Sequence, residues 1–342
     1  MDKNGSKKKV SGKSPKKKIS KPKAKDAPKK KIDKKIDKKS EKNKNKNENS
    51  EKNTKLVKEI DDSLNNLGIF TMPEKIVVIG DIHADYLALT ETLEKAGLIN
   101  SDLDWTGRKV TVVIIGDLVD GKSRIGEWGN DSDIKVIKLI NHLSEKAKEK
   151  ESRIVVLLGN HEFMNMNGNF NYSGENSIKE MGGEEKRNFY FKNDFKKFAK
   201  KCFLATQFGN WVFCHAGIPQ EISSNHNIAE LNTMLDRFLN NNMDAVEVAK
   251  FTNIISGKNG ILTNREFGGF QINNNRLNKT LENLKADHMV VGHTVQSKVN
   301  STGDGKLWRV DTGMSRAFGE DNSDIKGFLL IYDYGKKTKI FR

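Results

Sequence analysis

Short apolar runs rich in Val and Ile recur along the chain, and three of them end in a glycine that is followed at once by a polar residue. Such runs are typical of strands that are buried on both faces of a largely parallel sheet. We predict strands of this kind at 74–80 before Asp81, at 109–115 before Asp117 and at 153–158 before Asn160. Because the carboxyl ends of parallel strands meet at one edge of a sheet, these polar residues are expected to converge on one crevice.

Helical patterns separate the predicted strands. Asp85 is a suitable N-cap for a helix over residues 85–97, in which apolar residues recur at helical spacing. Residues 132–149 show the same periodicity. Strands that alternate with helices in this way predict an α/β domain.

The second half of the chain continues the pattern with further elements. We predict a helix at 190–202, strands at 211–214, 288–291, 306–311 and 327–334, and two or three helices within 227–285. Strand 211–214 runs into His215, and strand 288–291 runs into Gly292 and His293. A short amphipathic helix at 54–67 leads into the first strand.

The charge of the chain is concentrated in its first 55 residues. They hold 23 lysines and 7 acidic residues, a net charge of +16, whereas residues 56–342 hold 37 basic and 38 acidic residues. A segment of this composition cannot bury enough apolar surface to fold, so we predict a disordered Lys-rich tail at 1–55 and a catalytic domain at 56–342. The tail is expected either to contact acidic partners or nucleic acid, or to act only as a solubilising segment.

Cysteine content and hydropathy limit the cellular compartments that are expected for this protein. Cys202 and Cys214 are too few for a disulfide framework, which favours a reducing, intracellular and cytoplasmic setting, with the nucleus as an alternative because of the tail. Cys214 lies inside a predicted strand and is expected to be buried and unreactive. No apolar run approaches the roughly 18–20 residues that cross a bilayer, so no membrane insertion is expected. The near-neutral domain disfavours a nuclease.

Six residues near predicted strand ends are candidate metal ligands: Asp81, His83, Asp117, Asn160, His215 and His293. Asp81 and His83 are two positions apart, so in an extended chain they point to the same side. Mixed nitrogen and oxygen ligation without thiolate favours two divalent ions, manganese first, with iron and zinc as alternatives. Two such ions hold a bridging water, lower its pKa and stabilise an in-line displacement at phosphorus.

Further polar residues are candidates for proton transfer and for phosphate binding. His161, beside Asn160, is placed to protonate a leaving oxygen, and Asp120 is placed to orient the imidazole. The candidates for gripping phosphoryl oxygens are Arg265, Arg124, Lys122 and Arg187.

Five segments, in this order, resemble the motifs of calcineurin-like metallophosphoesterases: Gly80-Asp81-Ile82-His83, Gly116-Asp117-Leu118-Val119-Asp120, Gly159-Asn160-His161-Glu162, Cys214-His215-Ala216-Gly217 and Gly292-His293-Thr294. The Gly-Asn-His-Glu segment and the single Asp-x-His resemble phosphoprotein phosphatases of the PPP superfamily. Val310-Asp311-Thr312-Gly313-Met314-Ser315 is similar to their bacterial-type, Shewanella-like branch. The resemblance covers roughly residues 74–335.

The resemblance implies a four-layer α/β/β/α sandwich of two mixed sheets with a binuclear metal site at the strand carboxyl ends. It implies one ion on Asp81, His83 and Asp117, a second ion on Asp117, Asn160, His215 and His293, and a general-acid pair of His161 and Asp120. The Asp-Arg-Gly usual in the family reads Asp120-Gly121-Lys122 here. One phosphate-binding arginine is therefore missing from its usual place, and Arg124 or Lys122 is expected to substitute for it.

We expect a metal-dependent phosphoprotein phosphatase that hydrolyses phosphomonoesters of Ser, Thr or Tyr in a phosphoprotein or phosphopeptide. Hydrolysis is expected to proceed by direct attack of a metal-bridging hydroxide, without a phosphoenzyme. A hydrolase of small phosphoesters or dinucleoside polyphosphates, with the same motif order, is an alternative. A non-catalytic binding module localised by the basic tail is an alternative of another class. It predicts lost ligands, and none of the six is lost.

Overall fold

The computed structural model describes residues 54–124, 131–269, 271–319 and 327–341. The chain divides into two compact units, Met1–Lys58 and Glu59–Arg342. Residues 1–53 lie outside the described part, so the predicted disordered tail stays a prediction. Residues 54–66 are helical, which agrees with the helix predicted at 54–67.

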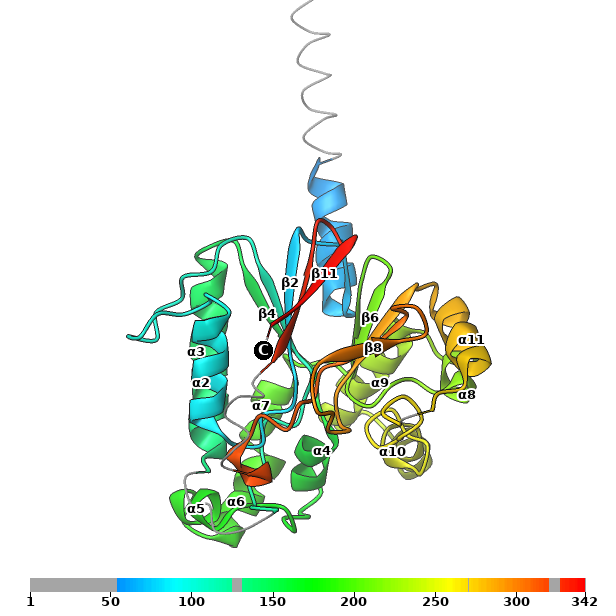
Figure 1. Cartoon of the computed structure of the whole chain (residues 1–342). Coiled ribbons are helices and arrows are strands. Elements are labelled where there is room, and N and C mark those ends of the chain that lie inside the picture. Colours follow the sequence, from blue (N-terminus) through cyan, green and yellow to red (C-terminus); the bar gives the residue numbers. More distant parts are fainter. Residues whose placement is uncertain (1–53, 125–130, 270, 320–326, 342) are drawn as a thin grey trace, which may run out of the picture. The chain divides into compact units, whose positions relative to one another are not determined.

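One sheet has five strands in the order β11-β10-β2-β3-β4, of which β11, β2 and β4 are labelled in Figure 1. β2 (Lys75–Ile79), β3 (Thr111–Ile114) and β4 (Arg153–Val156) are parallel neighbours, as their apolar runs predicted. β10 (Phe328–Tyr332) runs antiparallel to β2 and pairs on its other edge with β11 (Lys337–Phe341). The sheet is therefore mixed, and β2, which precedes Asp81, is its central strand.

The other sheet has six strands in the order β1-β5-β6-β7-β9-β8. They are β1 (Ile69–Phe70), β5 (Ala205–Phe208), β6 (Trp211–Cys214), β7 (His288–Val291), β9 (Leu307–Arg309) and β8 (Asn300–Thr302). β6, β7 and β9 match predicted strands. β1, β5 and β8, like β11, were not predicted, because short or polar strands leave little periodic signal.

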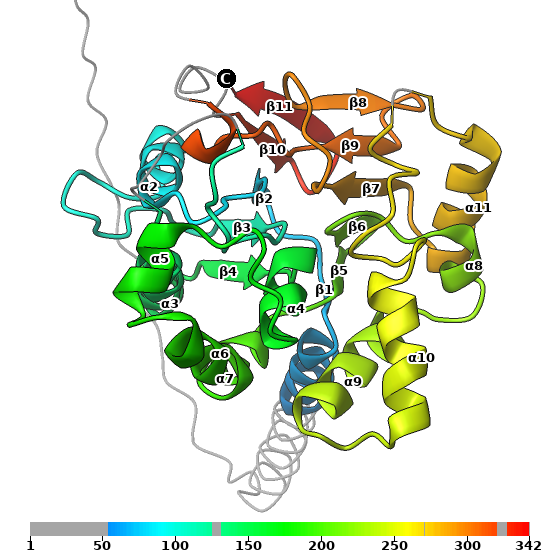
Figure 2. The same ribbon diagram turned by 90° about the horizontal axis from the view of Figure 1, so that it is seen from below.

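The two sheets pack face to face. In β2, Ile76 and Val78 belong to the core between the sheets, with Trp211 and Phe213 of β6. Val77 and Ile79 point the opposite way into the core beneath the helices, because successive residues of a strand alternate faces. Figure 2 shows α2 and α3 beside one sheet and α9 and α11 beside the other. This arrangement confirms the predicted four-layer α/β/β/α sandwich of two mixed sheets.

Two of the predicted helices begin at a residue whose side chain caps them. Asp85 Oδ1 accepts the Ala88 N–H at 2.8 Å at the start of α2 (Tyr86–Lys95), as predicted. Ser132 caps α3 (Asp133–Lys148). The remaining helices are α4 (Asn160–Met166), α5 (Glu175–Glu180), α6 (Glu184–Lys192), α7 (Phe195–Ala199), α8 (Gln220–Ser223), α9 (Ile228–Leu239), α10 (Ala245–Ser256), α11 (Asn274–Leu284) and the 3-10 turn Arg316–Phe318.

The helix predicted at 190–202 is wrong in its extent. α6 ends at Lys192 and α7 begins at Phe195, so the chain turns at 193–194. Phe191, Phe195 and Phe198 are all buried, which produced a helical pattern across a break between two helices. Among the described residues between 227 and 285 there are three helices, within the predicted number. In the part of the chain that the structure describes, no helix has both the length and the apolar character needed to cross a bilayer.

Candidate metal centre

The fold brings the predicted ligands to one edge of the paired sheets. Each follows or lies close to a strand end: Asp81 and His83 after β2, Asp117 after β3, Asn160 at the first turn of α4 after β4, His215 after β6 and His293 after β7. β2, β3 and β4 are parallel neighbours, and so are β6 and β7. Their carboxyl ends therefore carry the six side chains to a common region.

Three of these residues adopt a backbone conformation that L-residues rarely take. The φ angles of His83, Asp117 and His293 are 45°, 49° and 64°. Non-glycine residues in this region cost on the order of 1–3 kcal/mol and persist where their surroundings hold them. The Asp117 carbonyl is one such restraint, because it accepts the His83 N–H at 2.8 Å. Such strain is concentrated at functional sites.

Glu162, which was not predicted as a site residue, links the segments that follow β3 and β4. Its fully buried carboxylate accepts the N–H groups of Asp117 at 3.0 Å and of Leu118 and Gly159 at 2.7 Å each. The Val119 N–H contributes a longer contact of 3.3 Å. A carboxylate three residues into a helix that reaches back to the cap position is a recognisable signal, and Gly159-Asn160-His161-Glu162 carries it.

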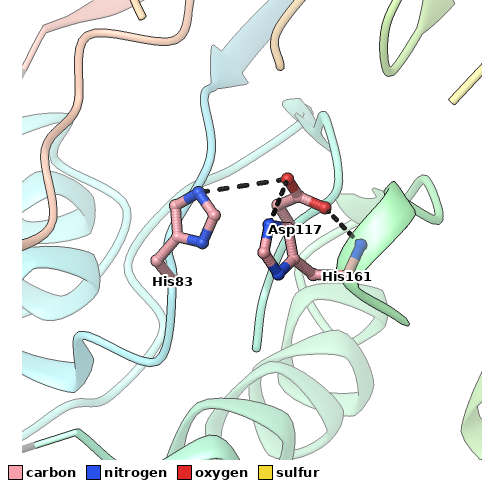
Figure 3. A group of neighbouring side chains, drawn as sticks. All are labelled: His83, Asp117 and His161. Atoms are coloured by element: carbon pink, nitrogen blue, oxygen red, sulfur yellow. Dashed lines mark hydrogen bonds and ion pairs between the residues drawn. The ribbon is translucent and has the colours of Figure 1, made fainter. Parts of the chain in front are cut away.

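The Asp117 carboxylate is the centre of the site. Its Oδ2 lies 3.3 Å from Nε2 of His215 and 3.9 Å from Nε2 of both His83 and His161. Its Oδ1 accepts the His161 N–H at 2.9 Å. Figure 3 shows the imidazoles of His83 and His161 turned toward this carboxylate. Burial raises the pKa of Asp117, but the imidazoles of His215 and His161 outweigh burial and hold that pKa well below its usual range.

These donor atoms fit divalent ions. His83, Asp117 and His161 form one group, and Asp117, His215 and His293 form another, with ligand atoms within 4.8 Å of one another in each group. Bond lengths of about 2.0–2.2 Å at tetrahedral or octahedral angles place two ligands about 3–3.5 Å apart, close to the spacings around Asp117. Asn160 Oδ1 lies 3.0 Å from His215 Nε2, within the same spacing.

Asp81 is fully buried and is absent from both groups. Its carboxylate accepts the His293 N–H at 3.0 and 3.3 Å. A Cβ on Gly292 would lie 2.3 Å from Asp81 Oδ1, so glycine is required there for the close approach of the two strand ends. The group of His83, Asp117 and His161 thus differs from the set expected for the first ion, which has Asp81 in place of His161.

A third carboxylate, Asp311, belongs to the site and was missed as a site residue. It is buried after β9 and lines the same cavity as Asp117. Burial, then Asp311 and Asp117, raise the pKa of Asp81 well above its ordinary value. The available signal for Asp311 was its position at the end of the strand predicted at 306–311. Divalent cations would relieve the repulsion among these three buried carboxylates.

The imidazoles differ in protonation. Burial lowers the pKa of both His83 and His293 to about 3, and the neighbouring imidazoles of His161 and His215 add to the effect. Both rings are therefore neutral at pH 7, with a lone pair for a metal. Burial acts in the same direction on His215, but Asp117 outweighs it and raises the pKa of His215.

His161 and Asp120 form a hydrogen-bonded pair. Nδ1 of His161 lies 2.8 Å from Asp120 Oδ2, with both side chains almost fully buried. Burial would lower the pKa of His161, but the carboxylates of Asp117 and Asp120 outweigh it and raise that pKa to about 8. The imidazole is therefore held as a proton donor at neutral pH, with Nε2 on the side of Asp117.

A cavity of about 580 Å³ opens over this cluster. Its lining includes His83, Asp117, Asn160, His161, His293, Asp311, Arg124, Arg265, Tyr172 and Phe318. The Arg124 guanidinium packs on the Tyr172 ring at 5.1 Å and on the Phe318 ring at 5.3 Å. Arg265 Nη1 donates to the His293 carbonyl at 2.9 Å and to Thr294 Oγ1 at 3.1 Å. Two guanidinium groups thus face the space above the candidate ligands.

The other two phosphate-binding candidates lie elsewhere. Among the described residues, neither Lys122 nor Arg187 lines this cavity. Lys122 Nζ donates to the Asn171 carbonyl at 3.2 Å. Arg187 is fully buried and ion-paired with Asp120 and Asp133, which corrects the expectation that it binds phosphate. Charge and position along the chain do not show whether an arginine is buried.

Comparisons with known proteins show which family this chain matches. The family described as calcineurin-like phosphoesterase matches residues 74–297, a segment that contains all six candidate ligands. Shewanella-like protein phosphatase 1 of Plasmodium berghei (strain Anka) is 28% identical over 285 residues, which cover 77% of this chain and 76% of the relative. Shewanella-like protein phosphatase 2 of Arabidopsis thaliana is 36% identical over 111 residues, covering 32% and 26%.

Solved structures share the fold. The cold-active protein-tyrosine phosphatase of a psychrophilic Shewanella species superposes with a TM-score of 0.63 at 20% identity, covering 80% of this chain and 82% of that chain. A Saccharomyces cerevisiae protein serine/threonine phosphatase gives a TM-score of 0.53 at 20% identity, covering 80% and 81%. The family match spans more than half of the chain. The chain therefore belongs to the calcineurin-like phosphoesterase family.

Proposed function

We propose that this chain is a metal-dependent phosphoprotein phosphatase that hydrolyses phosphomonoesters on Ser, Thr or Tyr side chains. The observation that carries the proposal is the Asp117 carboxylate, which lies between the imidazoles of His83 and His215 beside a cavity that two arginines line. The two Shewanella-like relatives are named protein phosphatases, which supports a phosphoprotein or phosphopeptide as the substrate.

The proposed metal ligands are the six predicted from the sequence: Asp81, His83 and Asp117 for one ion, and Asp117, Asn160, His215 and His293 for the other. Asp311 adds a further carboxylate to this region. Carboxylate, amide and imidazole donors without thiolate suit manganese, and they also accommodate iron or zinc. Bound ions would supply an acidified water and positive charge that stabilises the phosphoryl group during displacement.

The chain's own cations would orient the substrate. Arg124 and Arg265 both line the cavity although they are far apart in the sequence, and a guanidinium can bind two phosphoryl oxygens at once. Tyr172 and Phe318 hold Arg124 by packing on it, so its position is fixed before substrate binds. Arg124 thus substitutes for the arginine that is missing from Asp120-Gly121-Lys122.

His161 would provide the leaving-group proton. Hydrolysis adds water to phosphorus and breaks the ester P–O bond, and the departing oxygen needs a proton unless it is a stable anion. Nδ1 of His161 donates to Asp120, so the proton that can be transferred is the one on Nε2. The raised pKa of His161, about 8, keeps this proton in place at neutral pH.

The proposal is tested first by Asp117→Asn. This isosteric change removes the charge shared by both groups of ligands, and we expect it to abolish turnover of 4-nitrophenyl phosphate and to strip bound metal, measured by elemental analysis. Asp102→Asn, at an exposed position, is the matched control and should change neither. Wild-type turnover with wild-type metal content in Asp117→Asn would refute the proposal.

The substrate class is tested separately. Metal-stripped protein, with each divalent ion added back, is assayed on phosphoserine, phosphothreonine and phosphotyrosine peptides and on dinucleoside polyphosphates. The proposal expects manganese to restore peptide dephosphorylation at a kcat/KM well above that for the dinucleotides. Preference for the dinucleotides would assign the site to small phosphoesters.

A further inference from the structure

Arg187 is the largest charged side chain that is fully buried in the described part of the fold. It is fully buried on α6, and its guanidinium contacts two carboxylates and one amide. Nη2 lies 3.0 Å from Asp120 Oδ1, and Nη1 pairs with Asp133 Oδ2. Nε and Nη2 donate to Asn165 Oδ1 at 3.0 and 2.7 Å. The rings of Phe191 and Phe170 lie 4.8 and 5.4 Å from the guanidinium carbon and exclude water from its faces.

The guanidinium completes the hydrogen bonding of Asp120. Oδ1 of Asp120 accepts from Arg187 and from Ser173 Oγ at 2.6 Å. Oδ2 accepts from Asn165 Nδ2 at 2.8 Å and pairs with His161 Nδ1. A carboxylate has about four acceptor positions, and all four are occupied. It can neither rotate about its Cβ–Cγ bond nor accept a water without breaking one of these contacts.

The backbone of Asp120 is held by the same group. Asp120 has a φ of 71°, in the left-handed region, and its N–H donates to Asp133 Oδ1 at 2.9 Å. The other oxygen of Asp133 pairs with Arg187. Arg187 therefore restrains Asp120 twice, directly at the carboxylate and through Asp133 at the backbone. Asn165 closes the network by donating to the His161 carbonyl at 2.9 Å.

We propose that Arg187 is the positioning residue of the proton donor: through Asp120 it orients the His161 imidazole so that Nε2 points at the leaving oxygen. The inference rests on the proposed function and extends it to a residue that touches neither substrate nor metal ligand. It also explains why the chain maintains an arginine between two buried carboxylates, where well-packed apolar residues would often be as stable.

Leaving-group chemistry separates this role from a purely structural one. 4-Nitrophenolate is a stable anion and departs without protonation, whereas the benzyl alkoxide is a strong base and needs the proton. A misplaced imidazole therefore slows benzyl phosphate far more than 4-nitrophenyl phosphate. A general loss of structure or of metal slows both esters equally.

Arg187→Lys is the test variant, because lysine keeps the buried charge but cannot reach Asp120, Asp133 and Asn165 together. General acids contribute about 10²–10⁴-fold, so we expect kcat for benzyl phosphate to fall about 10²-fold and kcat for 4-nitrophenyl phosphate less than about threefold. Circular dichroism and metal content establish folding. Ser173→Ala removes only the other hydrogen-bond donor to Asp120 Oδ1 and is measured in the same way. It should also lower kcat for benzyl phosphate more than kcat for 4-nitrophenyl phosphate. This variant replaces Arg187→Lys in the test if Arg187→Lys does not fold.

Three comparisons complete the design. His161→Gln gives the largest shift in the ratio that loss of the acid can produce, and Arg108→Lys, at an exposed position, should give none. Inhibition by inorganic phosphate distinguishes positioning from phosphate binding: its Ki should be unchanged in Arg187→Lys and raised in Arg265→Lys.

Each result decides between the roles. A selective loss on benzyl phosphate with an unchanged phosphate Ki supports the inference. Equal losses on both esters, or no loss on either, overturn it. Wild-type protein that hydrolyses neither ester, with manganese bound, refutes the proposed function itself and is seen before any variant is compared.

Discussion

Gly159→Ala is expected to disrupt the metal centre through a single added methyl group. A Cβ at this position would lie 2.1 Å from Asp117 Oδ1 and 2.4 Å from the Asp117 backbone nitrogen. The φ of Gly159 is −100°, which any residue adopts, so the cost is one of contact alone. The side chain that must move is the carboxylate shared by both groups of candidate ligands.

The size of the effect follows from the contacts that would break. Ordinary van der Waals contact begins at 3.4 Å, so the Asp117 nitrogen must retreat by about 1 Å from its 2.4 Å separation. That shift breaks the hydrogen bond from Asp117 N to Glu162 Oε2 and the one from His161 N to Asp117 Oδ1. Hydrogen bonds to charged groups contribute about 1.5–3 kcal/mol each, which gives a loss of about 3–6 kcal/mol in the free energy of unfolding.

The assay combines urea unfolding with elemental analysis of bound metal. Gly97→Ala is the matched control, because Gly97 has a φ of 68° and an added Cβ there would meet nothing within 4 Å. We expect it to lose about 1 kcal/mol from backbone strain and to keep its metal. A Gly159→Ala protein that loses less than about 1 kcal/mol and retains wild-type metal would refute this reasoning.

Three further outcomes follow from titrating groups. Burial raises the pKa of Cys214 to about 12 and that of Cys202 well above its ordinary value, so a disulfide reagent at pH 8 should modify neither thiol until the protein is unfolded. In metal-free protein the Asp117 carboxylate outweighs burial and raises the pKa of His215. Only a neutral imidazole binds a metal, so the affinity for manganese, measured by calorimetry, should fall as the pH is lowered. The hydrogen bond from Arg276 lowers the pKa of Glu221 to about 2. The ion pair therefore stabilises the fold above pH 4–5, and this stabilisation is lost as the pH falls toward 2. Because Glu221 is mostly exposed, Glu221→Gln should lower the free energy of unfolding, measured with urea at pH 7, by under about 1 kcal/mol.

The sequence predicted well those features that depend on strand ends. β2, β3 and β4 are apolar on both faces, so they could be recognised as apolar runs in the sequence. Their parallel pairing brings Asp81, Asp117 and Asn160 together independently of the conformation of the connecting loops. The six candidate ligands could therefore be named before the fold was known.

Features that depend on side-chain partners across long stretches were not predictable in this way. Arg187 pairs with Asp120, 67 residues earlier, and nothing in its local sequence distinguishes a buried arginine from one that binds phosphate. The break between α6 and α7 was hidden because Phe191 and Phe195 keep helical spacing across it. Asp311 stands at the end of the strand predicted at 306–311, and this position could have marked its carboxylate as a site residue. The family resemblance concerned the motif as a whole and not this carboxylate.

The place of β10 has a consequence for how the protein is made. β10 pairs with β2, so the central strand of the five-stranded sheet acquires its second neighbour only when residues 328–332 have been synthesised. Until then one edge of β2 has unpaired backbone groups, a known template for aggregation. Chains emerge from the ribosome at about 5–20 residues per second, so this exposure lasts for many seconds. Asp81 and His83, the first candidate ligands to be translated, therefore follow a strand whose edge stays unpaired until the last part of the chain is made. Nascent chains truncated before residue 328 are expected to be substrates for chaperones.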